Sequence, residues 1–286
     1  MDQFSNGTLI FPVRDTAPSG EGNGEAVVLL HGFPQIGSSW DALVPSLTGA
    51  GYRVLVPDQR GYAPTALPRG RRPYRMTELA RDVVALLDQA GIDKAHVVGH
   101  DWGAVAAWAT AADHPQRLLS LTALSVPHPS AMLAASYRSA QALKSWYMLA
   151  FQLPWLPEQL LNPSRPAARR RLVRALVTSG QERGAAERDA AALAEPGVFT
   201  GALNWYRALP FSRRLGRVAV PTLFLWGRRD RFIGRRAASL CGRYVDGPFE
   251  FRELPGDHWI QADVYYPLLT HLAAHGRARE SGGSGI

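Results

Sequence analysis

The chain lacks the residues that build disulfide frameworks and cysteine-ligated zinc sites. Its 286 residues include a single cysteine, Cys241. One cysteine cannot form an intrachain disulfide, and a structural zinc site of this kind needs several thiolate ligands. The sequence therefore predicts a fold that its hydrophobic core holds together without a structural metal.

Long hydrophobic runs are also missing. No uninterrupted apolar stretch approaches the ~18 residues of a membrane-spanning helix. The first residues, MDQFSNGTLIFPVRD, carry acids and polar groups where a signal peptide would have a basic region and an apolar run. We therefore expect no membrane partner and a cytoplasmic location.

Lysine is nearly absent, although the chain is basic. Lys and Arg number 32 against 24 Asp and Glu, a formal net charge of +8, and the lysines are Lys94 and Lys144 alone. Arginine can neutralise phosphate, but the dense cluster at residues 165–174 (RPAARRRLVR) has no interleaved aromatic residues to stack on bases. We interpret the cluster as a solvated helix face and expect no nucleic-acid partner.

Apolar runs alternate with helical patterns along most of the chain, and this alternation predicts the fold class. Such strands, separated by helices, indicate a mostly parallel sheet covered on both faces. Thr77 is expected to cap the second predicted helix. The strands are predicted at residues 26–30, 52–56, 95–98, 118–126, 220–227 and 249–254, and the helices at 38–49, 77–91, 104–113, 234–242 and 260–275.

The alternation is interrupted by a long segment without a convincing strand. Residues 128–217 are helical in pattern, aromatic and broken by prolines. We predict an α/β core in two parts, residues 1–127 and 218–286, with residues 128–217 inserted as a helical cap. The end of the chain is expected to be flexible from about residue 277.

The segment Gly99-His-Asp-Trp-Gly103 lies between a predicted strand and a predicted helix. This is the context of a nucleophile elbow, whose glycines permit a tight turn that projects the middle side chain above the sheet. The middle residue is Asp101, where esterases and lipases have serine. Its place at the start of a helix favours an ionised carboxylate. Asp101 is the candidate nucleophile, although a helix-capping aspartate has the same local pattern.

Three more polar residues follow predicted strands. His31, in HGFP, ends the first strand, where an oxyanion-hole loop belongs. Asp230 follows a later strand, and His258 follows the last one. Each is unremarkable alone, but nucleophile, acid and histidine in this order match the triad of α/β hydrolases. His100, beside the nucleophile, is interpreted as structural.

Five motifs together span nearly the whole chain: HGFPQ (31–35), GHDWGA (99–104), FQLP (151–154), NWYR (204–207) and GDHWIQ (256–261). With these motifs the chain resembles the soluble epoxide hydrolases of the α/β-hydrolase superfamily. The resemblance implies an α/β-hydrolase fold, a cis peptide between Phe33 and Pro34, and paired cap tyrosines at Tyr147 and Tyr206.

The chemistry implied by the resemblance explains the aspartate. A serine that attacked an epoxide carbon would form a stable ether, whereas a carboxylate forms an ester that water can hydrolyse. Asp101 would form this ester, and His258, oriented by Asp230, would activate the water. The tyrosines would protonate the departing oxygen to give a vicinal diol. The partners are then an epoxide and water, with no cofactor and no catalytic metal.

The remaining site predictions concern the oxyanion and the substrate. The backbone N–H groups of Phe33 and Trp102 are expected to form the oxyanion hole. The oligomeric state is not predicted. The candidate substrate-binding residues are His31, Pro34, Trp146, Phe151, Trp155, Trp205 and Trp259.

Two other functions remain open from the sequence. A haloalkane dehalogenase would use the same Asp-His-Asp triad, although its second halide donor is often an Asn at the position of Phe33. A non-catalytic ligand-binding protein on this fold is a more distant alternative, because all three triad positions are filled here.

Overall fold

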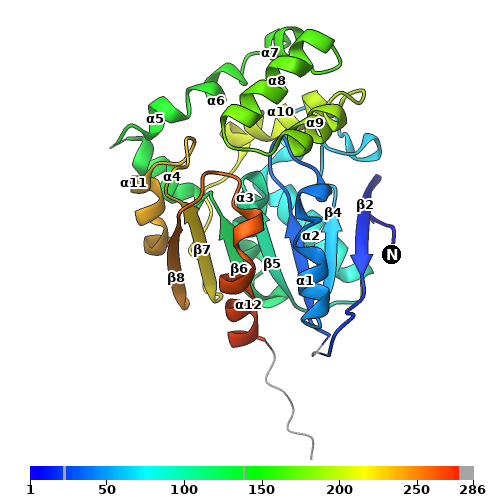
Figure 1. Ribbon diagram of the computed structural model, residues 1–286, viewed down its shortest axis with the longest axis vertical. Helices are drawn as coiled ribbons and strands as arrows, with labels where there is room; N and C mark the ends of the chain where they lie inside the picture. The colour runs from blue at the N-terminus through cyan, green and yellow to red at the C-terminus, as the bar shows by residue number, and fades with distance from the viewer. Residues whose placement is uncertain (22–23, 138, 277–286) are drawn as a thin grey trace, which may run out of the picture.

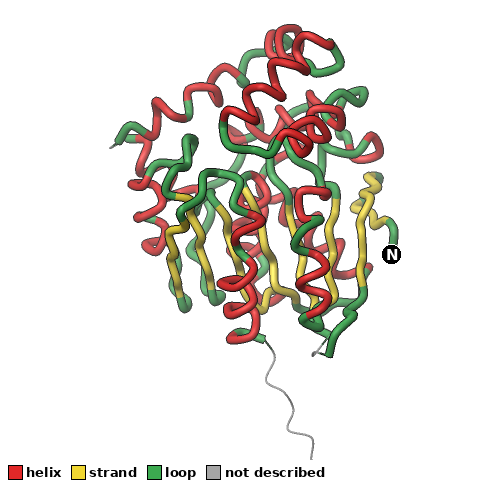
Figure 2. Tube along the Cα trace, in the orientation of Figure 1, coloured by secondary structure: helices red, strands yellow, loops and turns green. Residues whose placement is uncertain are grey.

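The computed structural model describes residues 1–21, 24–137 and 139–276. Within these ranges eight strands form one sheet in the order β1-β2-β4-β3-β5-β6-β7-β8 (Figures 1 and 2). Strands β3 to β8 are parallel, while β1 and β2 are antiparallel. The strands are Gln3–Asn6 (β1), Leu9–Thr16 (β2), Ala26–Leu30 (β3), Arg53–Pro57 (β4), Ala95–His100 (β5), Leu118–Leu124 (β6), Thr222–Gly227 (β7) and Phe249–Leu254 (β8).

Helices cover both faces of the sheet. Because successive side chains of a strand point to opposite faces, Val27 and Leu29 pack with α1 and α12, while Val28 and Leu30 pack with α2 and α3. The prediction of a mostly parallel, doubly covered sheet is therefore confirmed. The helices of the core are Val44–Gly49 (α1), Met76–Gln89 (α2), Trp102–Asp113 (α3), Arg235–Ser239 (α11) and Tyr265–Ala274 (α12).

The antiparallel hairpin β1-β2 was not predicted. The rings of Phe4 and Phe11 stack at 4.7 Å and are buried against the core. In β1 and β2, buried residues such as these two alternate with exposed ones, as expected for a sheet edge with one solvated face. Such a short alternation is a weak signal beside the continuous apolar runs of the central strands.

Several predicted helices differ from the observed ones at their ends. Residues 38–49 form a 3-10 turn and then α1, because Pro45 cannot donate a backbone hydrogen bond and sits in the first turn of the new helix. The prediction that Thr77 caps a helix is wrong. Helix α2 begins earlier, at Met76, and Arg75 is its N-cap without a side-chain hydrogen bond.

The segment between β6 and β7 folds into helices that lie above the carboxyl ends of the strands (Figure 1). The arginines of α8 are exposed, in agreement with a solvated helix face. The boundaries at 127/128 and 217/218 remain a prediction, and the tail from residue 277 lies outside the described residues. The inserted helices are Pro129–Ser136 (α4), Gln141–Lys144 (α5), Trp146–Ala150 (α6), Leu156–Leu161 (α7), Pro166–Thr178 (α8), Arg183–Ala192 (α9) and Val198–Arg207 (α10).

No helix in the described ranges is both long enough and apolar enough to cross a bilayer.

Candidate active site

The three triad candidates follow three parallel strands of the sheet, so they lie at the same edge of it. Asp101 directly follows β5, Asp230 follows β7 and His258 follows β8. Parallel strands place their carboxyl ends at one edge, so residues far apart in the sequence meet there. The inserted helices lie above this edge (Figure 2).

The backbone holds Asp101 in a sparsely populated conformation. Its φ is 52° and its ψ is −119°, between the end of β5 and the start of α3. The turn is possible because Gly103 has no side chain: a Cβ there would lie 2.1 Å from the carbonyl oxygen of Leu30. Strain of this kind persists where the surrounding structure fixes it, and here it projects the carboxylate above the sheet.

The two oxygens of Asp101 have different environments. Its Oδ1 accepts a hydrogen bond of 2.9 Å from the backbone N–H of Phe33, and its Oδ2 lies 3.4 Å from Nε2 of His258. Burial raises the pKa of Asp101, but His258 and the backbone N–H of Trp102 help to lower it below its usual value. The carboxylate is therefore ionised, with one oxygen held and the other facing the histidine.

His258 lies between two carboxylates. Its Nδ1 is 2.8 Å from Oδ2 of Asp230, whose Oδ1 accepts hydrogen bonds from the backbone N–H groups of Phe232 and Ile233. Burial lowers the pKa of His258, but Asp230 and Asp101 outweigh burial and raise it to about 10. The resting histidine is thus an imidazolium.

The main chain of His258 is also anchored. Its carbonyl oxygen accepts a hydrogen bond of 2.7 Å from the hydroxyl of Ser125 and lies 2.8 Å from Nε2 of His100. Burial lowers the pKa of His100 to about 4, so its neutral ring donates through Nε2. Its Nδ1 then accepts from the amide of Gln261, at 3.0 Å. The structural interpretation of His100 is confirmed, whereas this hydrogen-bond network was not predicted.

The loop of His258 also contacts the cap. The indole Nε1 of Trp259 donates a hydrogen bond of 3.1 Å to the hydroxyl of Ser179, which directly follows α8. The backbone N–H of Trp259 donates to Asp257, so that acid is directed away from His258 and does not compete with Asp230.

Tyr147 and Tyr206 lie close together near Asp101, on two of the inserted helices. The ring centroids of Tyr147 and Tyr206 are 6.1 Å apart, and Tyr206 packs edge-on against Trp102 at 4.9 Å. Burial, and after it the charge of Asp101, raise the pKa of Tyr147. Burial and both neighbours, Tyr147 and Asp101, raise the pKa of Tyr206. Both phenols therefore keep their protons.

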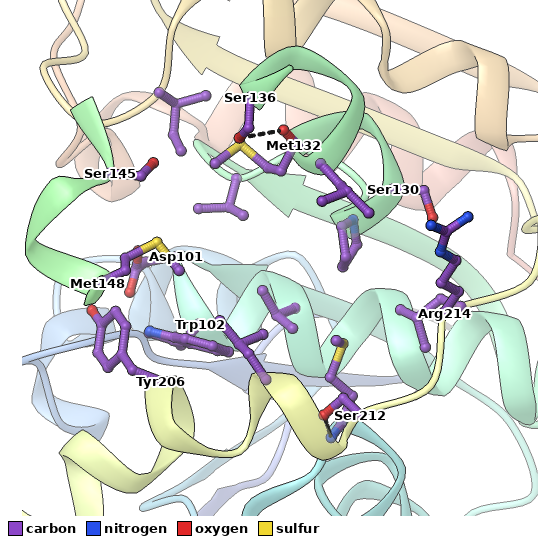
Figure 3. Close-up of a pocket in the computed structure, with 18 of the residues that line it drawn as sticks. Asp101, Trp102, Ser130, Met132, Ser136, Ser145, Met148, Tyr206, Ser212 and Arg214 are labelled. Carbon is purple, nitrogen blue, oxygen red and sulfur yellow. Dashed lines mark hydrogen bonds between the residues drawn. The ribbon is translucent and has the colours of Figure 1, made fainter. Parts of the chain in front are cut away.

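Two cavities in the described part of the chain meet at the nucleophile. We call them the first cavity, of about 340 Å³, and the second cavity, of about 440 Å³. Asp101, Tyr147 and Tyr206 line both. Figure 3 shows Asp101 and Tyr206 at one end of the first cavity. A ligand that reaches Asp101 therefore has space on two sides.

Four of the predicted substrate-binding residues line the second cavity, and three line neither cavity. His31, Trp155 and Trp205 are absent from the described walls of both. His31 is buried and accepts from the backbone N–H of Gln59, and Trp205 donates to the carbonyl oxygen of Arg60. Trp155 is 62% exposed. These three predictions are corrected: the first two support the site from below, and the third faces solvent. The four in the second cavity are Pro34, Trp146, Phe151 and Trp259.

The walls of the first cavity come largely from α4 and from residues 209–215, and no motif indicated them. They are mostly apolar and rich in methionine, with Met76, Met132 and Met148 among them.

The described residues contain no group of three or more His, Cys, Asp or Glu side chains placed to hold a metal ion.

Comparison with known proteins agrees with this geometry. Residues 25–264 match the alpha/beta hydrolase fold family. The chain belongs to the α/β-hydrolase family. This family is built on the mostly parallel sheet described above, with the nucleophile after β5.

Individual α/β-hydrolase relatives narrow the comparison. The chain is 36% identical to the AB hydrolase superfamily protein YfhM of Bacillus subtilis, over 85% of this chain and 87% of the relative. It is 32% identical to epoxide hydrolase A of Mycobacterium tuberculosis, over 86% and 88%. The crystal structure of epoxide hydrolase A from Mycobacterium thermoresistibile matches with a TM-score of 0.79 and 27% identity, over 96% of this chain and 98% of that one. The predicted resemblance to the epoxide hydrolases is confirmed.

Proposed function

We propose that this α/β-hydrolase is an epoxide hydrolase, a hydrolase of ether bonds that opens an epoxide to a vicinal diol through a covalent ester on Asp101. The observation that carries the proposal is that the two oxygens of the Asp101 carboxylate have different partners. Oδ1 accepts the N–H of Phe33, Oδ2 lies beside Nε2 of His258, and the residue lines both cavities. The relatives named epoxide hydrolases support the reaction class.

In the first step Oδ2 of Asp101 attacks an epoxide carbon, and the carbon–oxygen bond of the ring breaks. The released oxygen would be a strongly basic alkoxide, and it takes the proton of Tyr147 or Tyr206. The charge of Asp101 helps to raise the pKa of both phenols. Formation of the ester removes that charge, so the tyrosines become stronger acids as the alkoxide forms.

The same loss of charge prepares His258. Two carboxylates hold the resting imidazolium at a pKa of about 10, and esterification neutralises one of them. The pKa of His258 then falls, and His258 gives its proton back to the tyrosinate. The neutral ring can now act as a base. Asp230 holds the proton of the neutral ring on Nδ1 by a hydrogen bond and keeps Nε2 free to take a proton from water.

In the second step the activated water attacks Cγ of the ester. The oxyanion forms on Oδ1, where the N–H groups of Phe33 and Trp102 stabilise it. The intermediate collapses, His258 gives its proton to the departing alkyl oxygen, and the diol leaves. The proton left on the carboxyl group of Asp101 then passes to His258, which restores the imidazolium. The carboxylate is restored with one oxygen from water.

The experiment that tests this proposal is single turnover of His258→Gln. The variant should be alkylated by an epoxide and fail to release the diol, so intact-mass spectrometry should show the ester on Asp101. In wild type, a single turnover in water-18O should place the label in Asp101 and not in the diol. An absence of adduct with every epoxide that wild type converts, or label directly in the diol, would overturn the covalent mechanism.

The haloalkane dehalogenase alternative is separated by the tyrosines. A halide leaves without a proton, so replacing both tyrosines by phenylalanine should leave dehalogenation nearly unchanged. In an epoxide hydrolase the Tyr147→Phe, Tyr206→Phe double variant should slow alkylation by roughly 10²–10⁴-fold. Halide release from chloro- or bromoalkanes that survives the double change, with no diol from any epoxide, would favour the dehalogenase.

We also propose that residues 128–217 act as the cap of this site. Helix α6 carries Tyr147 and helix α10 carries Tyr206, so the inserted segment supplies the leaving-group chemistry while the core supplies the nucleophile and base.

A further inference from the structure

The first cavity runs from the nucleophile to a cation. Figure 3 shows Asp101 and Tyr206 toward one end, and Arg214 and Ser130 at the other. Between these ends the walls are mostly apolar, and Ser136, Ser145 and Ser212 are the polar side chains among them. The apolar residues include Val105, Val126, Met132, Leu133, Leu209 and Leu215. A substituent in this cavity therefore meets a hydrophobic corridor first and a charged group at its end.

Two adjacent arginines at this end differ in their partners. Arg213 forms an ion pair with the carboxylate of Asp113. Arg214, which is exposed and also lines the cavity, has no acidic partner among residues 1–21, 24–137 and 139–276. The charge of Arg213 is thus already balanced, whereas Arg214 still has its guanidinium donors available.

We propose that Arg214 is a specificity-determining residue that binds a carboxylate on the substrate. A guanidinium presents a planar set of N–H donors that matches the two oxygens of a carboxylate. The substrate class is then an epoxide with an apolar chain on one ring carbon, and the chain ends in a carboxylate at Arg214. The other ring substituent occupies the second cavity. This inference rests on the proposed epoxide hydrolase function.

The apolar corridor is what makes an anionic substrate compatible with this site. The nucleophile is itself an anion, so a carboxylate bound near it would be repelled and would weaken binding. At Arg214 the carboxylate lies at the far end of the cavity from Asp101 and has its own cation (Figure 3). The second cavity also contains two cations, Lys144 and Arg231, and both adjoin Asp230 of the proposed triad. The ammonium of Lys144 donates to the carbonyl oxygen of Asp230, and Arg231 directly follows Asp230 in the chain. Arg231 is therefore the matched control.

The test compares free acids with their methyl esters. The probes are disubstituted epoxides with a phenyl group on one carbon and an alkyl chain of increasing length, ended by the carboxylate, on the other. For wild type, kcat/KM should be higher for the acid than for its ester at one best chain length. Arg214→Leu should lower kcat/KM for that acid about 10-fold, because a charge-assisted hydrogen bond is lost at a partly solvated position. The loss should appear in KM, since the contact is equal before and during the reaction.

Control variants make the outcome decisive. Arg214→Lys should retain part of the preference, Arg214→Glu should reverse it toward the ester, and Arg231→Leu should leave it unchanged. Neutral styrene oxide should be converted equally by wild type and Arg214→Leu. If wild type converts neutral epoxides but does not prefer the acid, or if Arg231→Leu and not Arg214→Leu removes the preference, this inference is wrong while the proposed function stands. If no epoxide is converted at all, both are wrong.

Discussion

Buried histidines at the two ends of the sheet have pKa values shifted in opposite directions, although burial lowers the pKa of each. At the carboxyl end, burial lowers the pKa of His258, but two carboxylates raise it to about 10. At the other end, burial lowers the pKa of His96 and of His271 to about 4. His96 lies 3.3 Å from the carboxylate of Glu25, yet desolvation exceeds that attraction. The difference teaches that burial lowers the pKa of a ring beside one carboxylate or none, whereas the two carboxylates beside His258 outweigh it.

Removal of Asp230 should break this difference with the largest effect. In Asp230→Asn the amide can still accept the N–H groups of Phe232 and Ile233 but donates toward Nδ1 of His258. The ring then holds its proton on Nε2 and cannot accept one from water. Hydrolysis of the ester should slow by on the order of 10⁴-fold, measured as single-turnover accumulation of the adduct.

Asp257→Asn is the matched control for this change. Asp257 adjoins His258 in sequence but accepts from the backbone N–H of Trp259. Diol release should stay within a few-fold of wild type. An equal loss in both variants would contradict the assignment of Asp230 as the partner of His258.

The pH dependence of the two steps should differ, because their groups titrate in different states. The pKa of Asp101 is lowered, so alkylation should remain constant as the pH falls from 8 to 5. Hydrolysis needs neutral His258 in the ester state, where the charge of Asp101 beside it has been removed. Its rate should fall about tenfold for each pH unit below that lower pKa. Quenched-flow assays at pH 5 should show the adduct, and alkylation that falls in parallel with hydrolysis would oppose this sequence.

Folding stability should report the same contrast with a smaller effect. The pKa of His96 and of His271 is depressed to about 4 in the folded state, against the ordinary value of 6.5. Their contribution is therefore complete above pH 6.5 and is lost as the pH falls from 6.5 toward 4, by at most roughly 3 kcal/mol for each group. His258, whose pKa is raised, contributes fully below pH 6.5 and loses its contribution as the pH rises through about 10. Urea unfolding at pH 7, 5.5 and 4.5 measures the acid side.

Replacement of His271 should produce the smallest change. His271 is buried on α12, and its Nε2 has no hydrogen-bond partner in the described structure. In His271→Phe the loss of stability between pH 7 and 4.5 should be smaller than in wild type, since one buried ring no longer takes up a proton. His114→Gln is the control, because His114 does not belong to the pair of buried histidines, His96 and His271. An unchanged pH dependence would remove His271 from the comparison.

The sequence predicted those features that local patterns encode. Continuous apolar runs marked the central strands, and the triad followed because Asp101, Asp230 and His258 each come after a strand. The apolar run before Asp101 and the helical pattern after it defined the elbow. These signals are read over a few residues, so tertiary contacts are not needed to recognise them.

Features that depend on distant contacts were not predictable. Gln35 and Gln261 meet at His100, although they are 65 and 161 residues away from it along the chain. The exposure of Trp155 and the burial of Trp205 have the same origin, because tryptophans in the cap look alike in sequence whether they face the core or solvent. The division of the site into two cavities also arises only when α4 and α6 lie against the core.

The hydrogen bond between Trp259 and Ser179 has a consequence for heat inactivation. It joins the loop that carries the base to the end of α8, so the cap cannot lift there without releasing that loop. Local openings of such peripheral elements cost less free energy than unfolding of a central sheet. Warming should therefore abolish turnover at a temperature below that at which the sheet melts, and cooling should restore it. We therefore expect the temperature at which turnover is lost to depend on the hydrogen bond between Trp259 and Ser179, and the temperature of unfolding to depend on the core.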